Sequence, residues 1–196
     1  MSEAIESYSQ GWYQESYQKL QISLEINPNY LQAKKLVDKL ENIVKILPQE
    51  TGEEKIPWLV RRGITAFLEG NSDLALDALI YASQLEPGRR DLSALAKLVR
   101  KEHPKVIVLE EGKNLVETKL SQMLKLLLKR EYETAAKRGE EILLLEPDNV
   151  VVLTRLGSAY WSLGRKEEAR EAWQKALKIN PENQELINFL EKMGEK

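Results

Sequence analysis

The fold is decided by residues 150–181, which read VVVLTRLGSAYWSLGRKEEAREAWQKALKINP. In the first half, residues recur at the i, i+3, i+4, i+7 spacing of one helical face: Leu153, Leu156, Gly157 and Tyr160. Gly164 ends this helix, since glycine readily adopts the left-handed conformation that closes helices. The second helix carries a small-large-small set, which is Ala169, Trp173 and Ala176. Pro181 disfavours the helical state in Asn180 and stops the second helix, so the stretch predicts a helical hairpin.

The same residues resemble the tetratricopeptide repeat almost position for position. This resemblance implies an all-α protein, a right-handed superhelical solenoid of helical hairpins that stack and present a groove. Such repeats bind protein or peptide partners and do not carry out chemistry themselves. The partner itself is not named by the sequence.

Two further stretches share the frame of residues 150–181. Residues 56–87 keep most of it, although Leu79 stands where the large aromatic is expected. Residues 116–147 are a weaker copy, because Met123 replaces the glycine and Gly139 replaces the aromatic.

The chain also starts within a repeat, whose first helix would begin about three residues before Met1 in the family frame. We therefore expect a fragment or an expression start, the alternative being a natural start with a shortened helix. Residues 182–193 resemble a C-terminal capping helix, which closes a soluble solenoid, so we expect the C-terminus to be the true end. Its expected inner face comprises Leu186, Ile187, Phe189 and Leu190.

The spacing of the prolines predicts extra helices between the early repeats. Pro28, Pro87 and Pro147 are 59 and 60 residues apart, whereas Pro147 and Pro181 are 34 apart. The longer spacing predicts helices near 30–47 and 90–102, each acting as a first helix whose second helix is missing. The polar linker 48–55 is expected to be mobile. Linker 103–112 contains a β-prone run at 106–109 and is expected to be extended or to open the next helix.

These features predict three groups along the chain. Residues 1–55 hold a partial hairpin, an extra helix and a linker, and residues 56–112 hold a hairpin, an extra helix and a linker. Residues 113–196 hold two repeats and the capping helix.

Composition excludes several functions. The formal charge is −2, with both signs interspersed, so no electrostatic feature favours nucleic acid. No run approaches the length of a membrane span. The absence of cysteine excludes thiolate chemistry but leaves cytoplasm and periplasm both open. His103, the one histidine, cannot form a metal site alone. We therefore expect no catalytic residues, no metal and no cofactor.

The resemblance places positions 2, 5, 9 and 12 of each unit on the concave groove. The expected protein-binding residues are Val60, Ile64, Phe67, Leu120, Leu124, Leu127, Thr154, Ser158 and Trp161. Pro57, Glu117 and Val151 begin the same rows. The rows over 57–67 and 117–127 are mainly apolar and suit a partner helix or an apolar peptide, with Phe67 and Trp161 as anchors. The alternative is that the extra helices or linker 103–112 cover this groove within the chain.

The sequence thus favours a non-enzymatic scaffold or adaptor for protein–protein interaction. Two alternatives stay open. One is a structural protein that assembles with its own copies. The other is an accessory domain of a larger enzyme, envelope or secretion machine.

Overall fold

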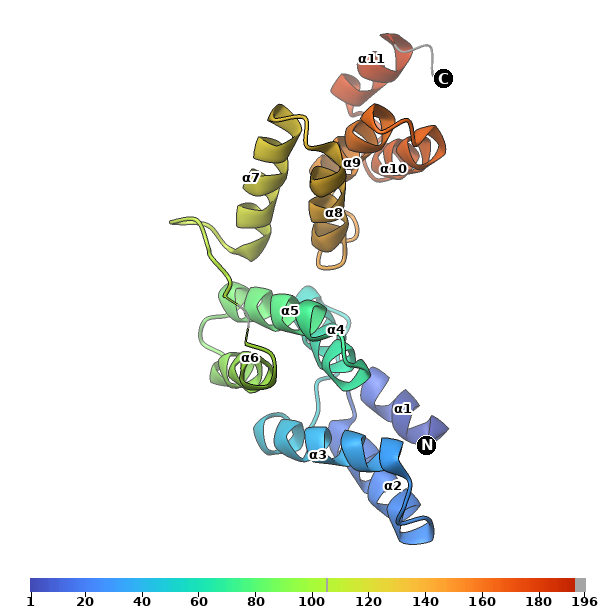
Figure 1. Cartoon of the computed structure of the whole chain (residues 1–196), viewed down its shortest axis with the longest axis vertical. Coiled ribbons are helices and arrows are strands. Elements are labelled where there is room, and N and C mark those ends of the chain that lie inside the picture. The colour runs from blue at the N-terminus through green and yellow to red at the C-terminus, as the bar shows by residue number, and fades with distance from the viewer. Residues whose placement is uncertain (105, 193–196) are drawn as a thin grey trace. The chain divides into compact units, whose positions relative to one another are not determined.

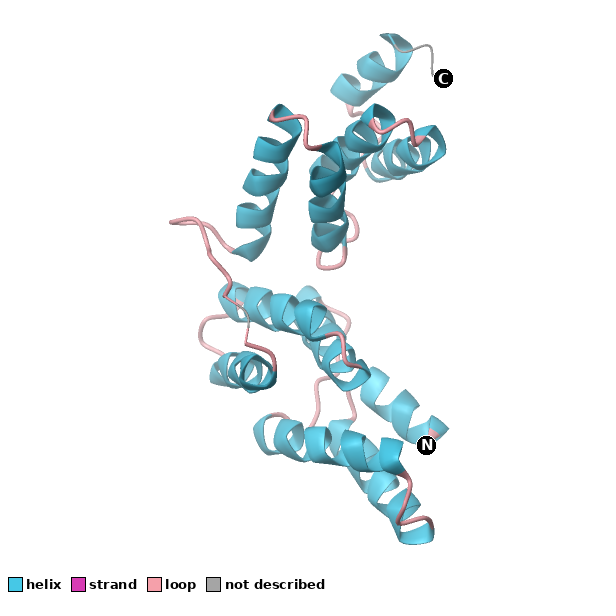
Figure 2. Cartoon of the chain, in the orientation of Figure 1, coloured by secondary structure: helices cyan, strands magenta, loops and turns pink. Residues whose placement is uncertain are grey.

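A computed structural model describes residues 1–104 and 106–192 of the chain, and in this part helices are the only regular elements (Figure 2). In chain order they are α1 (Ser2–Ser9), α2 (Tyr13–Ile26), α3 (Leu31–Ile46), α4 (Lys55–Glu69), α5 (Ser72–Leu85), α6 (Arg90–Glu102), α7 (Leu115–Leu128), α8 (Tyr132–Leu143), α9 (Val150–Ser162), α10 (Lys166–Ile179) and α11 (Gln184–Lys192). The expected all-α fold of repeated hairpins is confirmed.

The chain forms two compact units, Met1–Val108 with α1 to α6 and Leu109–Lys196 with α7 to α11 (Figure 1). The hairpins are α1–α2 and α4–α5 in unit 1, and α7–α8 and α9–α10 in unit 2. Helices α3 and α6 are the predicted extra helices. They pack on α2 and α5 as α9 packs on α8, so each takes the place of a next repeat's first helix.

A glycine against a large side chain fixes the close approach within the hairpins. A Cβ added to Gly157 would lie only 2.3 Å from Nε1 of Trp173, and one added to Gly63 would lie 2.9 Å from Cγ of Leu79. Real contacts are about 3.5 Å or longer, so only a residue without a Cβ fits at these crossings. Trp173 is 1% exposed, so it belongs to the core of the last repeat.

The α7–α8 hairpin has the same pair in the reverse order. Here the large side chain is Met123 on the first helix, and the small residue is Gly139 on the second. A Cβ on Gly139 would lie 2.9 Å from Cε of Met123. The two departures from the repeat pattern therefore compensate each other.

The hairpin turns share one backbone conformation. Gly11, Gly70 and Gly164 have φ of +92°, +90° and +78°. Arg130 occupies the same place between α7 and α8 with φ of +61°. A side chain in this region costs roughly 1–2 kcal/mol, so Arg130 is a strained position at the surface.

The linker between α3 and α4 is anchored, contrary to the expectation that it moves freely. The backbone N–H of Glu50 donates to the carbonyl of Gly11, and that of Gln14 donates to the carbonyl of Pro48, both at 2.9 Å. A Cβ on Gly11 would lie 1.9 Å from the carbonyl oxygen of Glu50. The linker thus lies directly on the α1–α2 turn.

The side chain of Glu50 provides a further anchor. It is buried, and its carboxylate lies 2.6 Å from the guanidinium of Arg89 at the start of α6. Arg89 also pairs with Asp91, and hydrogen bonds to both carboxylates raise the pKa of the guanidinium. An unpaired buried carboxylate is costly, so this pairing holds the linker to the α5–α6 turn.

Candidate protein-binding site

The three expected groove residues of α4 lie in the core of unit 1. Val60, Ile64 and Phe67 are at most 1% exposed. The ammonium of Lys39 on α3 lies 4.4 Å from the ring centroid of Phe67 and donates to its carbonyl at 2.6 Å. The expectation of an exposed row at these residues is therefore wrong. The alternative holds for Phe67, because the extra helix α3 lies over it.

The expected groove leucines of α7 are less buried than the expected groove residues of α4. Leu124 is 40% exposed, and Leu120 and Leu127 are half-buried. Leu128 beside them is 77% exposed. This helix therefore keeps apolar surface open to solvent, unlike α4.

Two expected residues of α9 line a cleft. Thr154 and Ser158 form its wall with Val150, Val151 and Arg155, and the opposite side comes from Asn183, Leu186 and Phe189 around α11. The volume of this cleft is about 450 Å³. Val151 is 48% exposed and Phe189 is 39% exposed, so apolar surface is accessible inside it.

The hydroxyl groups of Thr154 and Ser158 in the cleft are hydrogen-bonded to backbone carbonyls of their own helix. Thr154 Oγ1 donates to the carbonyl of Val150 at 2.9 Å, and Ser158 Oγ donates to the carbonyl of Thr154 at 3.2 Å. The indole N–H of Trp173 donates to the same carbonyl at 3.1 Å. These bonds hold the wall in place, and Arg155 is the charged side chain among the lining residues.

Trp161, the expected second anchor, belongs to an aromatic cluster beside the cleft. Its ring centroid lies 5.8 Å from that of Trp173, and Phe189 meets Trp173 edge-on at 5.4 Å. The ammonium of Lys166 lies 5.2 Å from the Trp161 centroid. Trp161 is half-buried, so it supports the core of the last repeat as well as offering surface.

The groove predicted from the sequence did not include Asn183, Leu186 and Phe189, which line the cleft. The sequence assigned Leu186 and Phe189 to the inner face of the capping helix, and Leu186 is indeed buried. Phe189 contacts the core at its edge and stays accessible in the cleft. Helical periodicity identifies the apolar face of a helix, but it does not show how much of that face the neighbouring helix covers.

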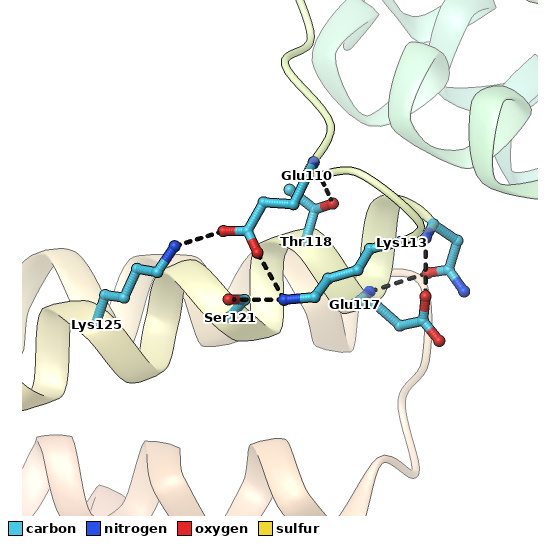
Figure 3. Close-up of polar contacts among 7 residues, drawn as sticks. Glu110, Lys113, Glu117, Thr118, Ser121 and Lys125 are labelled. Atoms are coloured by element: carbon cyan, nitrogen blue, oxygen red, sulfur yellow. Dashed lines mark hydrogen bonds and ion pairs between the residues drawn. The ribbon is translucent and has the colours of Figure 1, made fainter.

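A polar cluster joins the end of linker 103–112 to α7 (Figure 3). The carboxylate of Glu110 lies 2.6 Å from Nζ of Lys113 and 2.7 Å from Nζ of Lys125. Its backbone N–H donates to Thr118 Oγ1 at 3.1 Å. Hydrogen bonds from Lys113 and then Lys125 lower the pKa of Glu110 to about 2.

The described part of linker 103–112 is non-helical, as expected for an extended segment. Helix α7 begins after it with a capping box, in which Asn114 and Glu117 each bond the other's backbone N–H. His103 is the C-terminal cap of α6. Val106 and Val108 are 87% and 72% exposed.

Among the described residues, no group of three or more His, Cys, Asp or Glu side chains is placed to hold a metal ion. No described helix has the length and apolar character needed to cross a membrane.

Comparison with known proteins identifies a known repeat in the last part of the chain. Residues 150–183 match the tetratricopeptide repeat. A relative is the probable UDP-N-acetylglucosamine–peptide N-acetylglucosaminyltransferase SPINDLY of Petunia hybrida, 30% identical over 105 residues. The match covers 54% of this chain and 10% of the relative, so it spans about a tenth of that protein. The matched repeat is the hairpin α9–α10, and the other hairpins repeat its packing. The chain therefore carries a tetratricopeptide repeat at residues 150–183.

Proposed function

We propose that the chain is a non-enzymatic adaptor that binds a segment of another protein in the cleft between α9 and α11. Repeats of this family are protein–protein interaction modules, which supports binding in general. The observation that carries the site is the accessible apolar surface of Val151 and Phe189 inside a walled cleft. Binding sites are commonly concave and apolar with a few placed polar groups.

The chemistry of the cleft favours an apolar peptide with one acidic group. The hydroxyls of Thr154 and Ser158 already donate to their own helix, so they do not require a polar partner. Burial of Val151 and Phe189 by a partner would favour binding by roughly 25 cal/mol per Å² of apolar surface. Arg155 offers a charged donor to a carboxylate. The match spans 10% of the relative named as a transferase, so it gives no support for transferase activity in this chain.

Site-specific crosslinking tests this proposal. A photoreactive phenylalanine at position 158, introduced in the native host, is expected to capture a partner. Val151→Glu should abolish the crosslink, and it should leave the fold intact, because an acidic residue in the first turn of a helix is favourable. The matched control is Ile179→Glu, since Ile179 is also exposed, at 40%, but lies outside the cleft lining. An unchanged crosslink in Val151→Glu would contradict the proposal.

Self-association is the second candidate, favoured by exposed apolar side chains around the α2–α3 turn. Ile22, Ile26 and Leu31 are 56%, 82% and 71% exposed. Contiguous exposed apolar surface usually marks an interaction site. Light scattering over a concentration series is expected to show a rising mass that Ile26→Lys suppresses. A mass that stays at one chain throughout would rule this candidate out.

A further inference from the structure

A second cleft, in unit 1, lies against a face of α4 that differs from the face of Val60, Ile64 and Phe67. It holds about 470 Å³. Its wall is mainly polar and aromatic, and includes Ser9, Trp58, Arg61, Arg62, Thr65 and Asn71. Glu69 also lines it, one turn beyond Thr65. The cleft is independent of the one between α9 and α11.

The last repeat shows what normally covers this face. Trp58, Arg62 and Thr65 correspond to Val152, Leu156 and Ala159 in the frame of the repeat. In α9 those three are at most 4% exposed. Leu156 among them faces the preceding helix, since a Cβ on Gly139 of α8 would lie 3.3 Å from Cδ1 of Leu156.

Helix α3 has no second helix paired with it, because it is followed directly by the irregular linker and α4. Helix α1 packs on α4 and lines the cleft at Ser9, but it does not fill the cleft. The linker contacts this face where the guanidinium of Arg61 donates to the carbonyl of Gly52. Trp58, Arg62 and Thr65 remain half-buried. The cleft is therefore the space left by the missing second helix.

Arg62 gives the cleft its chemistry. It stands where the last repeat has Leu156, so a charged side chain occupies a position that is apolar when covered. Its guanidinium carbon lies 5.3 Å from the ring centroid of Trp58, and its Nε is buried without a hydrogen-bond partner. A buried donor without a partner is unfavourable, and a guanidinium matches a carboxylate with two parallel hydrogen bonds.

We propose that this cleft binds an acidic segment of a partner protein, with a carboxylate paired to Arg62 and backed by Trp58. Arg61 adds a second positive charge, while Thr65 and Asn71 supply neutral hydrogen-bonding groups. Glu69 repels a carboxylate and confines the acidic group to the end of the cleft that holds Arg62. Nucleic acid is disfavoured, since the chain carries a net charge of −2.

Fluorescence anisotropy with labelled octaglutamate tests the proposal on the full chain. Octaglutamate is expected to bind. In an NMR titration it should shift the indole N–H resonance of Trp58 and leave the resonance of buried Trp173 unchanged. Arg62→Leu, which installs the residue type of Leu156, should weaken binding by about tenfold or more, as expected when a charged hydrogen bond is lost. The matched control Arg100→Leu removes an exposed arginine of α6 and should change affinity by less than about twofold.

Other results would overturn the proposal. These are an absence of octaglutamate binding, equal binding of octalysine, or an unchanged affinity in Arg62→Leu. Thermal melting must first show that Arg62→Leu is folded, and Arg62→Gln takes its place if it is not. Val151→Glu should leave octaglutamate binding unchanged, which separates this site from the cleft of unit 2.

Discussion

The contact between Gly157 and Trp173 gives the sharpest prediction. In Gly157→Ala the new methyl would lie 2.3 Å from Nε1 and 2.5 Å from Cδ1 of the indole. The ring must then move by about 1 Å to restore an ordinary contact. It is rigid, 1% exposed, and held by its hydrogen bond to the carbonyl of Thr154. The substitution therefore strains the core of the last repeat.

The magnitude follows from three opposing effects. Overpacking costs about 1–3 kcal/mol, and a lost hydrogen bond costs about 1 kcal/mol. Alanine gains about 1 kcal/mol over glycine in a helix. Gly157→Ala should thus destabilise α9 and α10 by about 1–3 kcal/mol. Trp173→Ala should cost about 3–5 kcal/mol. In the Trp173→Ala background the clash is gone, so Gly157→Ala should stabilise by about 1 kcal/mol.

Hydrogen exchange of buried amides in α9 and α10 measures these opening free energies in the full chain. The expected coupling energy is about 2–4 kcal/mol, at or above the usual range for neighbours. Gly139→Ala is the matched control, since its new methyl meets the flexible end of Met123, which can move aside. The reasoning is refuted if Gly157→Ala has the same effect with and without Trp173, or is as mild as Gly139→Ala.

The other predictions concern four separate positions. Arg130→Gly should stabilise unit 2 by about 1 kcal/mol in urea unfolding, because glycine relieves the φ of +61°; a loss of stability would contradict this. The lowered pKa of Glu110 means that its tether to α7 is present above the ordinary pKa of 4.5 and is lost as pH falls toward about 2. A carboxyl NMR titration with a midpoint near 4.5 would disprove that tether. The amide of Glu50 should exchange more slowly than its neighbours, since it donates to Gly11; equal rates would mean that the linker is free. Phe67→Ala should cost about 3–5 kcal/mol in thermal or urea melts, whereas a loss below about 1 kcal/mol would indicate a surface position.

Local signals in the sequence determined the helices. The predicted hairpin over 150–181 is α9 and α10, which run from Val150 to Ile179. The extra helices expected near 30–47 and 90–102 are Leu31–Ile46 and Arg90–Glu102. Periodicity, turn glycines and helix-stopping prolines act within a few residues of one another, so one repeat suffices to display them. The sequence also contained both members of the Met123–Gly139 exchange, but each looked like a defect when considered alone.

Only the tertiary structure decided which faces are covered. Val60, Ile64 and Phe67 have the pattern of an open apolar row, yet they are buried in unit 1. Glu50 stands in a polar linker, yet it is buried against Arg89, which lies 39 positions later in the chain. Periodicity shows that a helix has an apolar face, but the burial of that face depends on a neighbour that can be distant in sequence. The last repeat has α8 in that position, whereas α4 has an irregular linker, and this difference leaves Arg62 in an open cleft.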